Sequence, residues 1–179
     1  MLSRLSRTVP ALLAAALALM GCNGPRVIAC PAVAILADAA IRPVLKPGSA
    51  GTDPSAVQYT VEMTGASQTC RLDTRLGEST SNILLSFRAT RTPTGQAARY
   101  TVPYFVAVNQ GERIVTKRPY TAMVDFPAGS ATVVFETNLT NTVLRFENGR
   151  LPTDYQYLVG LDVSPAERSY LTAVGRVAP

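Results

Sequence analysis

Apolar and polar residues alternate along much of the chain with the period of two that is typical of half-buried β-strands. In the first clear case, one face carries Val57, Tyr59, Val61 and Met63. The predicted strands are 57–63, 83–89, 100–108, 113–123, 131–144 and 155–163. Strand starts recur about every 10 to 20 residues, with turns between them, which favours an antiparallel β-sandwich over a parallel sheet.

Turn residues divide these strands. Gln110-Gly111 predicts a hairpin between 100–108 and 113–123, and Glu147-Asn148-Gly149 predicts a turn after 131–144. Pro103 lacks a backbone N–H, which implies an edge position or a bulge. Asp125 precedes Phe126-Pro127, so we expect it to face a turn, with a buried acid as the alternative.

Two local motifs mark the C-terminal part of the chain. The stretch 151–159 resembles the entry to the penultimate strand of immunoglobulin and fibronectin type III domains. That resemblance implies that Tyr157 is a tyrosine corner and that Val159 takes the place of the second immunoglobulin cysteine. The alternative is an ordinary strand with two tyrosines. Ser164-Pro165-Ala166-Glu167 is a capping box with proline at the first helical position, which predicts a short helix to about Thr172.

The first 22 residues have the pattern of an export signal. Arg4 and Arg7 form a positive region, and residues 11–20 are all apolar. As a helix, this apolar run would be about 15 Å long at roughly 1.5 Å per residue. It is therefore too short to span about 30 Å of hydrocarbon.

Leu19-Met20-Gly21-Cys22 follows directly and resembles the lipobox of bacterial lipoproteins. The resemblance implies a signal peptide at 1–21, acylation of Cys22 and a tether at 22–29. The alternating strands then place the β-sandwich domain at 30–179. The bilayer would then be a partner through the acyl chains, which anchor stably when there is more than one. Asn23, rather than Asp, implies the outer membrane. The alternative is cleavage after Ala18, which would leave three cysteines, an odd number, in an oxidising compartment.

Lipidation of Cys22 leaves Cys30 and Cys70 as an even pair, which should form a disulfide in the periplasm. A loop of about 40 residues is stabilised by roughly 4 kcal/mol in the chain-entropy model. A redox role is the alternative, but there is no C-x-x-C spacing and no His or Lys neighbour to lower a thiol pKa.

Composition narrows the function. There are 17 basic and 12 acidic residues, and removal of the leader leaves 15 against 12, a net charge of +3. This balance gives no case for nucleic acid. The chain has no histidine, which excludes Ser–His–Asp and Cys–His catalysis and every histidine-bearing zinc site. With no phosphate loop, metal-ligand spacing or nucleophile elbow either, we expect no catalytic residue, cofactor or metal.

Two groups of side chains remain as candidate contacts. Arg113, Lys117 and Arg118 lie on one predicted hairpin arm and are candidates for contacting phosphate or lipid headgroups. The alternative is that they are solvated residues that protect an edge strand. Four tyrosines could form an aromatic surface, although core packing is the default. They are Tyr100, Tyr104, Tyr155 and Tyr157.

Three stretches together, 30–36, 103–108 and 124–127, are similar in order and spacing to a group of small lipoproteins from Gram-negative bacteria, chiefly alphaproteobacteria. The resemblance implies an exported lipoprotein domain and brings no functional residue. We therefore expect a non-enzymatic envelope protein that binds or scaffolds an envelope protein or an anionic envelope component. The alternative is an accessory subunit of an envelope transport or secretion machine.

Overall fold

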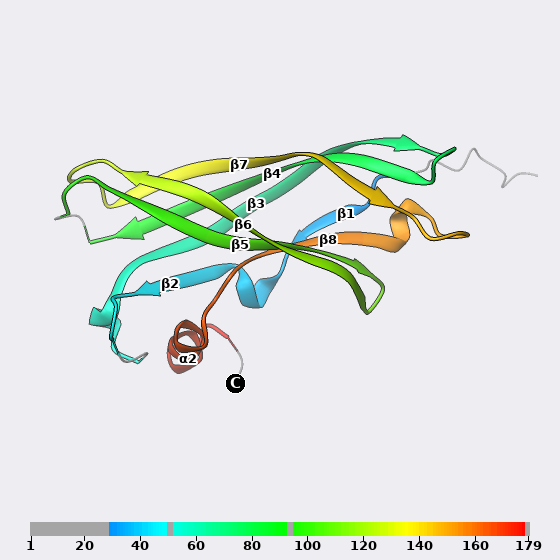
Figure 1. The fold of residues 1–179 in the computed structure, drawn as a ribbon. Coiled ribbons are helices and arrows are strands. Elements are labelled where there is room, and N and C mark those ends of the chain that lie inside the picture. Colours follow the sequence, from blue (N-terminus) through cyan, green and yellow to red (C-terminus); the bar gives the residue numbers. More distant parts are fainter. Residues whose placement is uncertain (1–28, 50–51, 93–94, 178–179) are drawn as a thin grey trace, which may run out of the picture.

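Two four-stranded sheets pack face to face in the computed structural model, which describes residues 29–49, 52–92 and 95–177 (Figure 1). The first sheet has the order β1 (Ala32–Ile35), β8 (Tyr155–Leu161), β5 (Ala98–Gln110) and β6 (Arg113–Phe126). The second has the order β2 (Ile41–Leu45), β3 (Val57–Asp73), β4 (Glu78–Arg91) and β7 (Thr132–Arg145). Only β1 and β8 pair in parallel among these strands. The predicted all-β sandwich is confirmed, while residues 1–28, including Cys22, lie outside the described part.

Alternation along the strands creates the core between the sheets. Val61, Ile83, Leu85, Phe87 and Val124 have no exposed surface. Their neighbours along each strand point the other way, as the pleat requires. Burial of such side chains stabilises the fold by about 1.5 to 3 kcal/mol each. Among the described residues, core side chains from both sheets form one hydrophobic cluster.

The predicted strands and turns are present. The strands β3 to β6 are longer than the sequence indicated, β7 has the predicted length, and β8 ends two residues earlier, at Leu161. β5 and β6 form the predicted hairpin, where Gly111 has a φ of +58°. Gly149 has a φ of +80° in the turn after β7. Both values lie in the left-handed region, which glycine enters at little cost. The strands β1 and β2 have only four and five residues, and the alternating pattern did not predict them.

Pro103 is accommodated by neither an edge strand nor a bulge. Its strand β5 lies between β8 and β6, and the register shift in the β5–β6 pairing falls between Val108 and Asn109. The pairing with β8 ends at Tyr104, one residue after Pro103. The proline nitrogen therefore lies just past the paired part of β8, where no ladder hydrogen bond is lost.

Asp125 lies within β6, so the predicted turn position is wrong, and the alternative of a buried acid is wrong as well. Its side chain is 60% exposed and forms an ion pair with Arg99, the residue opposite it on β5. The turn begins only after Phe126. Cross-strand pairs of opposite charge stabilise a sheet slightly.

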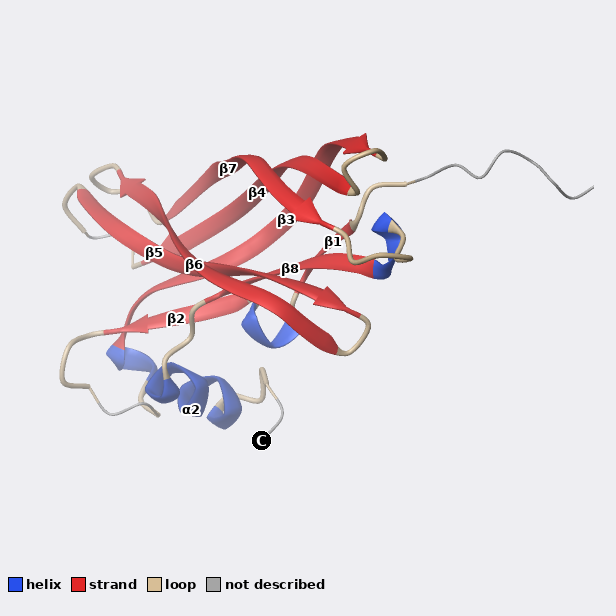
Figure 2. Ribbon diagram, turned by 45° about the vertical axis from the view of Figure 1, so that its right-hand side comes forward, coloured by secondary structure: helices blue, strands red, loops and turns tan. Residues whose placement is uncertain are grey.

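The C-terminal helix α2 (Pro165–Ala173) follows the predicted capping box. Ser164 accepts from the Glu167 backbone N–H at 3.3 Å, and Glu167 accepts from the Ser164 backbone N–H at 2.8 Å. Figure 2 shows the helix beside β2, on the side of the sandwich away from β7. Short 3₁₀ turns are η1 (Ala37–Ala39), η2 (Pro54–Ala56) and η3 (Pro152–Asp154). No helix among the described residues has the length and apolar character needed to cross a membrane.

Candidate functional site

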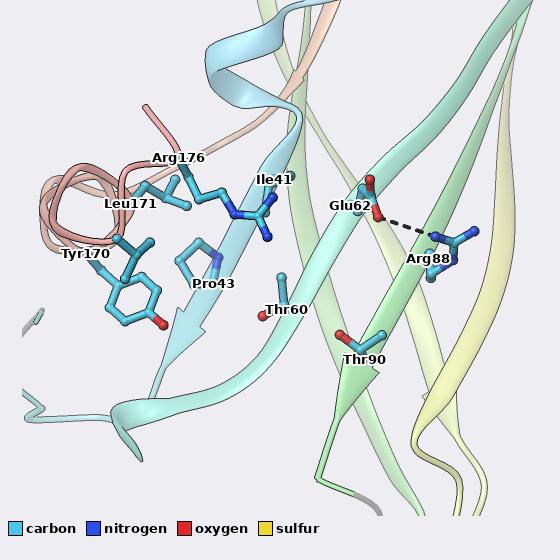
Figure 3. A pocket seen from close by; sticks show the side chains of 10 residues that line it. Ile41, Pro43, Thr60, Glu62, Arg88, Thr90, Tyr170, Leu171 and Arg176 are labelled. Atoms are coloured by element: carbon cyan, nitrogen blue, oxygen red, sulfur yellow. Dashed lines mark ion pairs between the residues drawn. The ribbon is translucent and has the colours of Figure 1, made fainter. Parts of the chain in front are cut away.

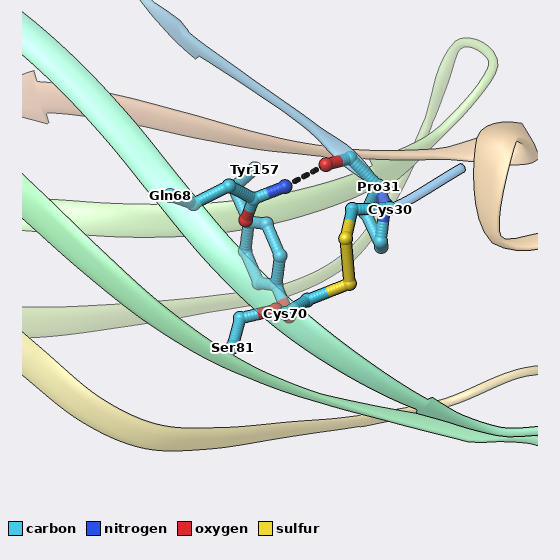
Figure 4. Close-up of a disulfide and its surroundings, with 6 residues drawn as sticks. All are labelled: Cys30, Pro31, Gln68, Cys70, Ser81 and Tyr157. Atoms are coloured by element: carbon cyan, nitrogen blue, oxygen red, sulfur yellow. Dashed lines mark hydrogen bonds between the residues drawn. A yellow bond between two sulfur atoms is a disulfide. The ribbon is translucent and has the colours of Figure 1, made fainter.

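Cys30 and Cys70 lie at disulfide distance, in agreement with the predicted pairing, and their Cα atoms are 6.0 Å apart (Figure 4). Cys30 precedes β1 in the first sheet, and Cys70 lies on β3 in the second. The bridge therefore joins the two sheets. Beside it, the side-chain amide of Gln68 donates to the Pro31 carbonyl. This arrangement ties the start of the domain to the sandwich.

Tyr155, and not Tyr157, has the hydroxyl that bonds back to the backbone. The Tyr155 hydroxyl accepts from the Glu147 backbone N–H at 2.8 Å, eight positions upstream. The Tyr157 hydroxyl instead lies inside the sandwich, 3.5 Å from Ser81 Oγ. The assignment of Tyr157 as a tyrosine corner is therefore wrong. The reason is the alternation of β8, which directs both rings inward but places Tyr155 at the end beside the β7 loop.

The four tyrosines singled out from the sequence pack in the core and do not form an aromatic surface. Tyr104, Tyr155 and Tyr157 are buried, and Tyr100 stacks on Tyr59 with ring centroids 4.3 Å apart. Burial raises the pKa of Tyr157, partly opposed by the hydroxyls of Ser81 and Ser79. Burial likewise raises the pKa values of Tyr59 and Tyr104. These buried phenols are therefore harder to ionise than exposed ones.

The three cations of the predicted basic arm all lie on β6 but do not form one surface. Arg113 pairs with Glu147, in the loop after β7. The Lys117 ammonium lies 4.0 Å from the centroid of the Phe105 ring, on the outer face of the first sheet. Arg118 is next to Lys117 in the strand and so points to the opposite face. The structure therefore leaves Arg118 as the member of the three with neither a carboxylate nor a ring partner among the described residues.

One candidate site is a cleft of about 470 Å³ between α2 and the outer face of β2, β3 and β4 (Figure 3). We call it the helix–sheet cleft. Tyr170 and Leu171 line it from the helix, and Glu62 and Arg88 line it from the sheet. The Glu62 carboxylate and the Arg88 guanidinium lie 3.6 Å apart. Both side chains are about half exposed, so water screens this ion pair.

The charged groups that line the helix–sheet cleft are two guanidinium groups and one carboxylate. Arg88 and Arg176 supply two guanidinium groups, and Figure 3 shows Arg176 extending toward β2 from the end of the helix. Guanidinium groups stay protonated in proteins and so cannot act as bases. Glu62 is the one carboxylate among the lining residues, and Arg88 already partners it.

A second candidate site is a cleft of about 430 Å³ between β6 and β7, the edge strands on one side of the sandwich. We call it the β6–β7 cleft. Its lining combines Arg118 and polar side chains with core residues of both sheets. The sequence analysis identified Arg118 but not the cleft, because the cleft depends on how the two sheets pack.

Nothing in the described ranges groups three or more His, Cys, Asp or Glu side chains as a metal site would require. No family model, curated protein or solved structure matches the chain. The resemblance to the group of small lipoproteins therefore stays a prediction.

Proposed function

We propose that the chain is an exported lipoprotein, anchored by acyl chains on Cys22, whose β-sandwich binds components of the cell envelope and catalyses no reaction. The observation that carries this proposal is the pairing of cysteines. Cys30 and Cys70 meet at disulfide distance, and disulfides persist in oxidising compartments such as the periplasm. The third cysteine, Cys22, stands at the end of the apolar signal-like run, where the lipobox resemblance places the acylated residue.

The tether length fits a domain held close to a bilayer. Seven residues, 23–29, separate the anchor Cys22 from Cys30, the first cysteine of the sandwich, which makes eight steps along the chain. A fully extended chain advances at most about 3.3 to 3.6 Å per residue, so the tether reaches no more than about 29 Å. The ligands of such a domain would come from the membrane or from the adjacent envelope. Asn23 favours the outer membrane, with the domain in the periplasm.

We also propose that the sandwich is of the immunoglobulin or fibronectin type III kind. Its two sheets are built almost entirely of antiparallel pairs. A tyrosine at the start of β8 bonds its hydroxyl to the backbone upstream, as a tyrosine corner does. Tyr155 takes this place in the proposal. Domains of this architecture serve chiefly as binding or structural modules, so the fold type agrees with a non-catalytic role without establishing it.

Metabolic labelling tests the anchor. The full-length chain is expressed in a Gram-negative host that is fed an alkyne analogue of palmitate, and the label is detected on the purified protein. We expect label on the wild-type chain and none on Cys22→Ala, which should accumulate as the larger precursor. Cys30→Ala/Cys70→Ala is the matched control and should keep the label. Acylation of Cys22→Ala at the wild-type level would overturn the proposal.

Cross-linking in intact cells tests the binding role. A cleavable cross-linker is applied to cells that express the acylated chain, and captured proteins and lipids are identified by mass spectrometry. We expect envelope components to be captured by the wild-type chain in larger amounts than by a secreted form without the anchor. Equal capture by both forms would show that the anchor does not position the domain.

A further inference from the structure

The β6–β7 cleft opens the interior of the sandwich to the outside. Val106 and Val108 on β5, Leu144 on β7 and the ring of Tyr157 on β8 line it. All four belong to the core cluster, and each is less than 8% exposed. A molecule entering between the two edge strands meets the small exposed parts of these four side chains together with polar side chains of β6 and β7. Apolar ligand atoms placed there would be removed from water. This burial of apolar surface is a main driving force of small-ligand binding.

Arg118 places a positive charge beside this apolar surface. It lines the cleft together with hydroxyl groups that include those of Thr116 and Thr140. None of the residues that line the cleft is acidic, and Arg118 forms none of the ion pairs found among the described residues. A guanidinium that lacks a carboxylate partner binds a carboxylate well, because its fork matches both oxygens.

The β7 side of the cleft has an unusual backbone. Asn141 has a φ of +54°, and it is the one non-glycine residue with positive φ among those described. The pairing of β4 with β7 shifts register here, and the Asn141 backbone N–H donates to the Asn82 side-chain oxygen at 3.0 Å. Bulges redirect side chains, and a left-handed non-glycine residue costs about 1 kcal/mol or more. The Asn82 side chain therefore stabilises the left-handed conformation of Asn141 beside the cleft.

We propose that the β6–β7 cleft binds a single-chain amphiphile with a carboxylate head, that is, a long-chain fatty acid. The carboxylate pairs with Arg118, and the alkyl chain lies against Val106, Val108 and Leu144. The cleft volume of about 430 Å³ falls within the usual range for small-molecule sites. A cationic head would leave the guanidinium without a partner, so the site selects against cationic amphiphiles.

The free edge of β6 and the helix–sheet cleft are weaker candidates for binding a ligand. An extended peptide added to the edge of β6 would need a continuous row of backbone donors, and Pro119 interrupts that row. In the helix–sheet cleft, Arg88 is paired with Glu62, while Arg176 forms none of the ion pairs found among the described residues. None of the residues that line this cleft belongs to the core cluster between the two sheets. Of these three features, only the β6–β7 cleft combines an unpartnered cation with surface from the core.

This inference rests on the binding role in the proposed function but not on the anchor at Cys22. Loss of acylation in cells and loss of fatty-acid binding in solution are separate results, so either proposal can fail without the other. The chain 23–179, which lacks the acylated Cys22, suits the second test, because it keeps both sheets, the core and the two paired cysteines.

Isothermal titration of this chain with dodecanoate, below its critical micelle concentration, measures the affinity. We expect one site per chain. Dodecyltrimethylammonium, with the same tail and the opposite charge, should bind at least tenfold more weakly, and acetate should show no measurable binding. These two comparisons use the unaltered protein and do not depend on the folding of a variant.

The variants then locate the site. Arg118→Ala should weaken dodecanoate binding at least tenfold, while Lys117→Ala, the adjacent cation on the opposite face, should bind like the unaltered chain. Thr116→Trp should fill the cleft and remove binding while the melting temperature stays close to that of the unaltered chain. The proposal is overturned if dodecanoate does not bind, if the cationic analogue binds equally well, or if the Arg118 and Lys117 variants behave alike.

Discussion

The Arg42 guanidinium on β2 lies 3.0 Å from the Glu167 carboxylate on α2, across 125 positions of sequence. The Arg42 side chain is 15% exposed and that of Glu167 is 5% exposed. Glu167 also caps its own helix by accepting from the Ser164 backbone N–H. One carboxylate thus starts the helix and holds it against the second sheet.

The first prediction concerns this ion pair. Arg42→Met leaves the Glu167 carboxylate buried without its partner and should lower the free energy of unfolding by about 3 kcal/mol. Arg88→Met is the matched control, because Arg88 pairs with the half-exposed Glu62 and should cost less than about 1 kcal/mol. Urea denaturation followed by circular dichroism measures both changes. Equal losses in the two variants would show that the Arg42 pair is not effectively buried.

The sequence predicted that Glu167 caps its own helix, but it did not predict the ion pair of Glu167 with Arg42. The capping box is local, so four adjacent residues were enough to predict α2 and its first turn. Arg42 lies in β2, a five-residue strand in which Pro43 and its neighbours show no clear alternation. A contact over 125 positions depends on how the sheets and the helix pack, and no local pattern reports that.

The second prediction concerns the bridge between the sheets. Cys30→Ala/Cys70→Ala should lower the free energy of unfolding by about 4 kcal/mol, since the loop that the bridge closes spans 40 positions. For a domain of this size, 1 kcal/mol corresponds to roughly 2 to 4 °C, so the melting temperature should fall by about 8 to 16 °C. Differential scanning calorimetry of the variant and of the reduced wild-type chain measures this. An unchanged melting temperature after verified reduction would contradict the prediction.

The third prediction concerns a close approach on the outer face of the first sheet. A Cβ atom at Gly160 would lie 2.7 Å from both Ala39 Cβ and Phe105 Cζ. Gly160→Ala should therefore push η1 and the Phe105 ring away from β8 and cost about 1 to 3 kcal/mol. Gly65→Ala is the matched control within a strand, because its Cβ would come no closer than 3.6 Å to Ser86. Thermal melts compare the two, and similar melting temperatures for both variants would argue against the tight contact.

The fourth prediction distinguishes the two tyrosines of β8. Tyr155→Phe removes the acceptor of the Glu147 backbone N–H and should cost about 1 kcal/mol or more. Tyr157→Phe removes only a 3.5 Å contact to Ser81 and should cost about 0.5 kcal/mol or less. Chemical denaturation of both variants gives the order. The reverse order would restore Tyr157 as the structurally important hydroxyl.

The candidate sites could be predicted from the sequence only in part. The period of two already separates Lys117 from Arg118, since adjacent residues of a strand face opposite sides. The neighbours of Arg113 depend on a shift in the β5–β6 register after Val108. No residue in the hairpin predicts that shift. The β6–β7 cleft forms only because edge strands of two different sheets lie next to each other. For that reason the sequence indicated the cation at residue 118 but not the apolar surface beside it.

The last prediction concerns alkaline pH. Burial is the largest cause of the raised pKa values of Tyr59, Tyr104 and Tyr157. In the unfolded chain a phenol ionises near pH 10. Below that pH both states hold these protons, and stability is unaffected. Above it, the unfolded chain loses protons that the folded chain retains, so stability falls as pH rises.

Absorbance at 295 nm follows phenol ionisation, and far-UV circular dichroism follows the fold in parallel samples. Of the seven tyrosines, we expect these three to ionise only together with unfolding, at a pH above 10, as a late and cooperative step. In concentrated urea the same chain should titrate in a single step near pH 10, because each phenol is then exposed. Ionisation of all seven in one reversible step while the circular dichroism spectrum stays native would show that the three phenols are accessible to water in the folded sandwich.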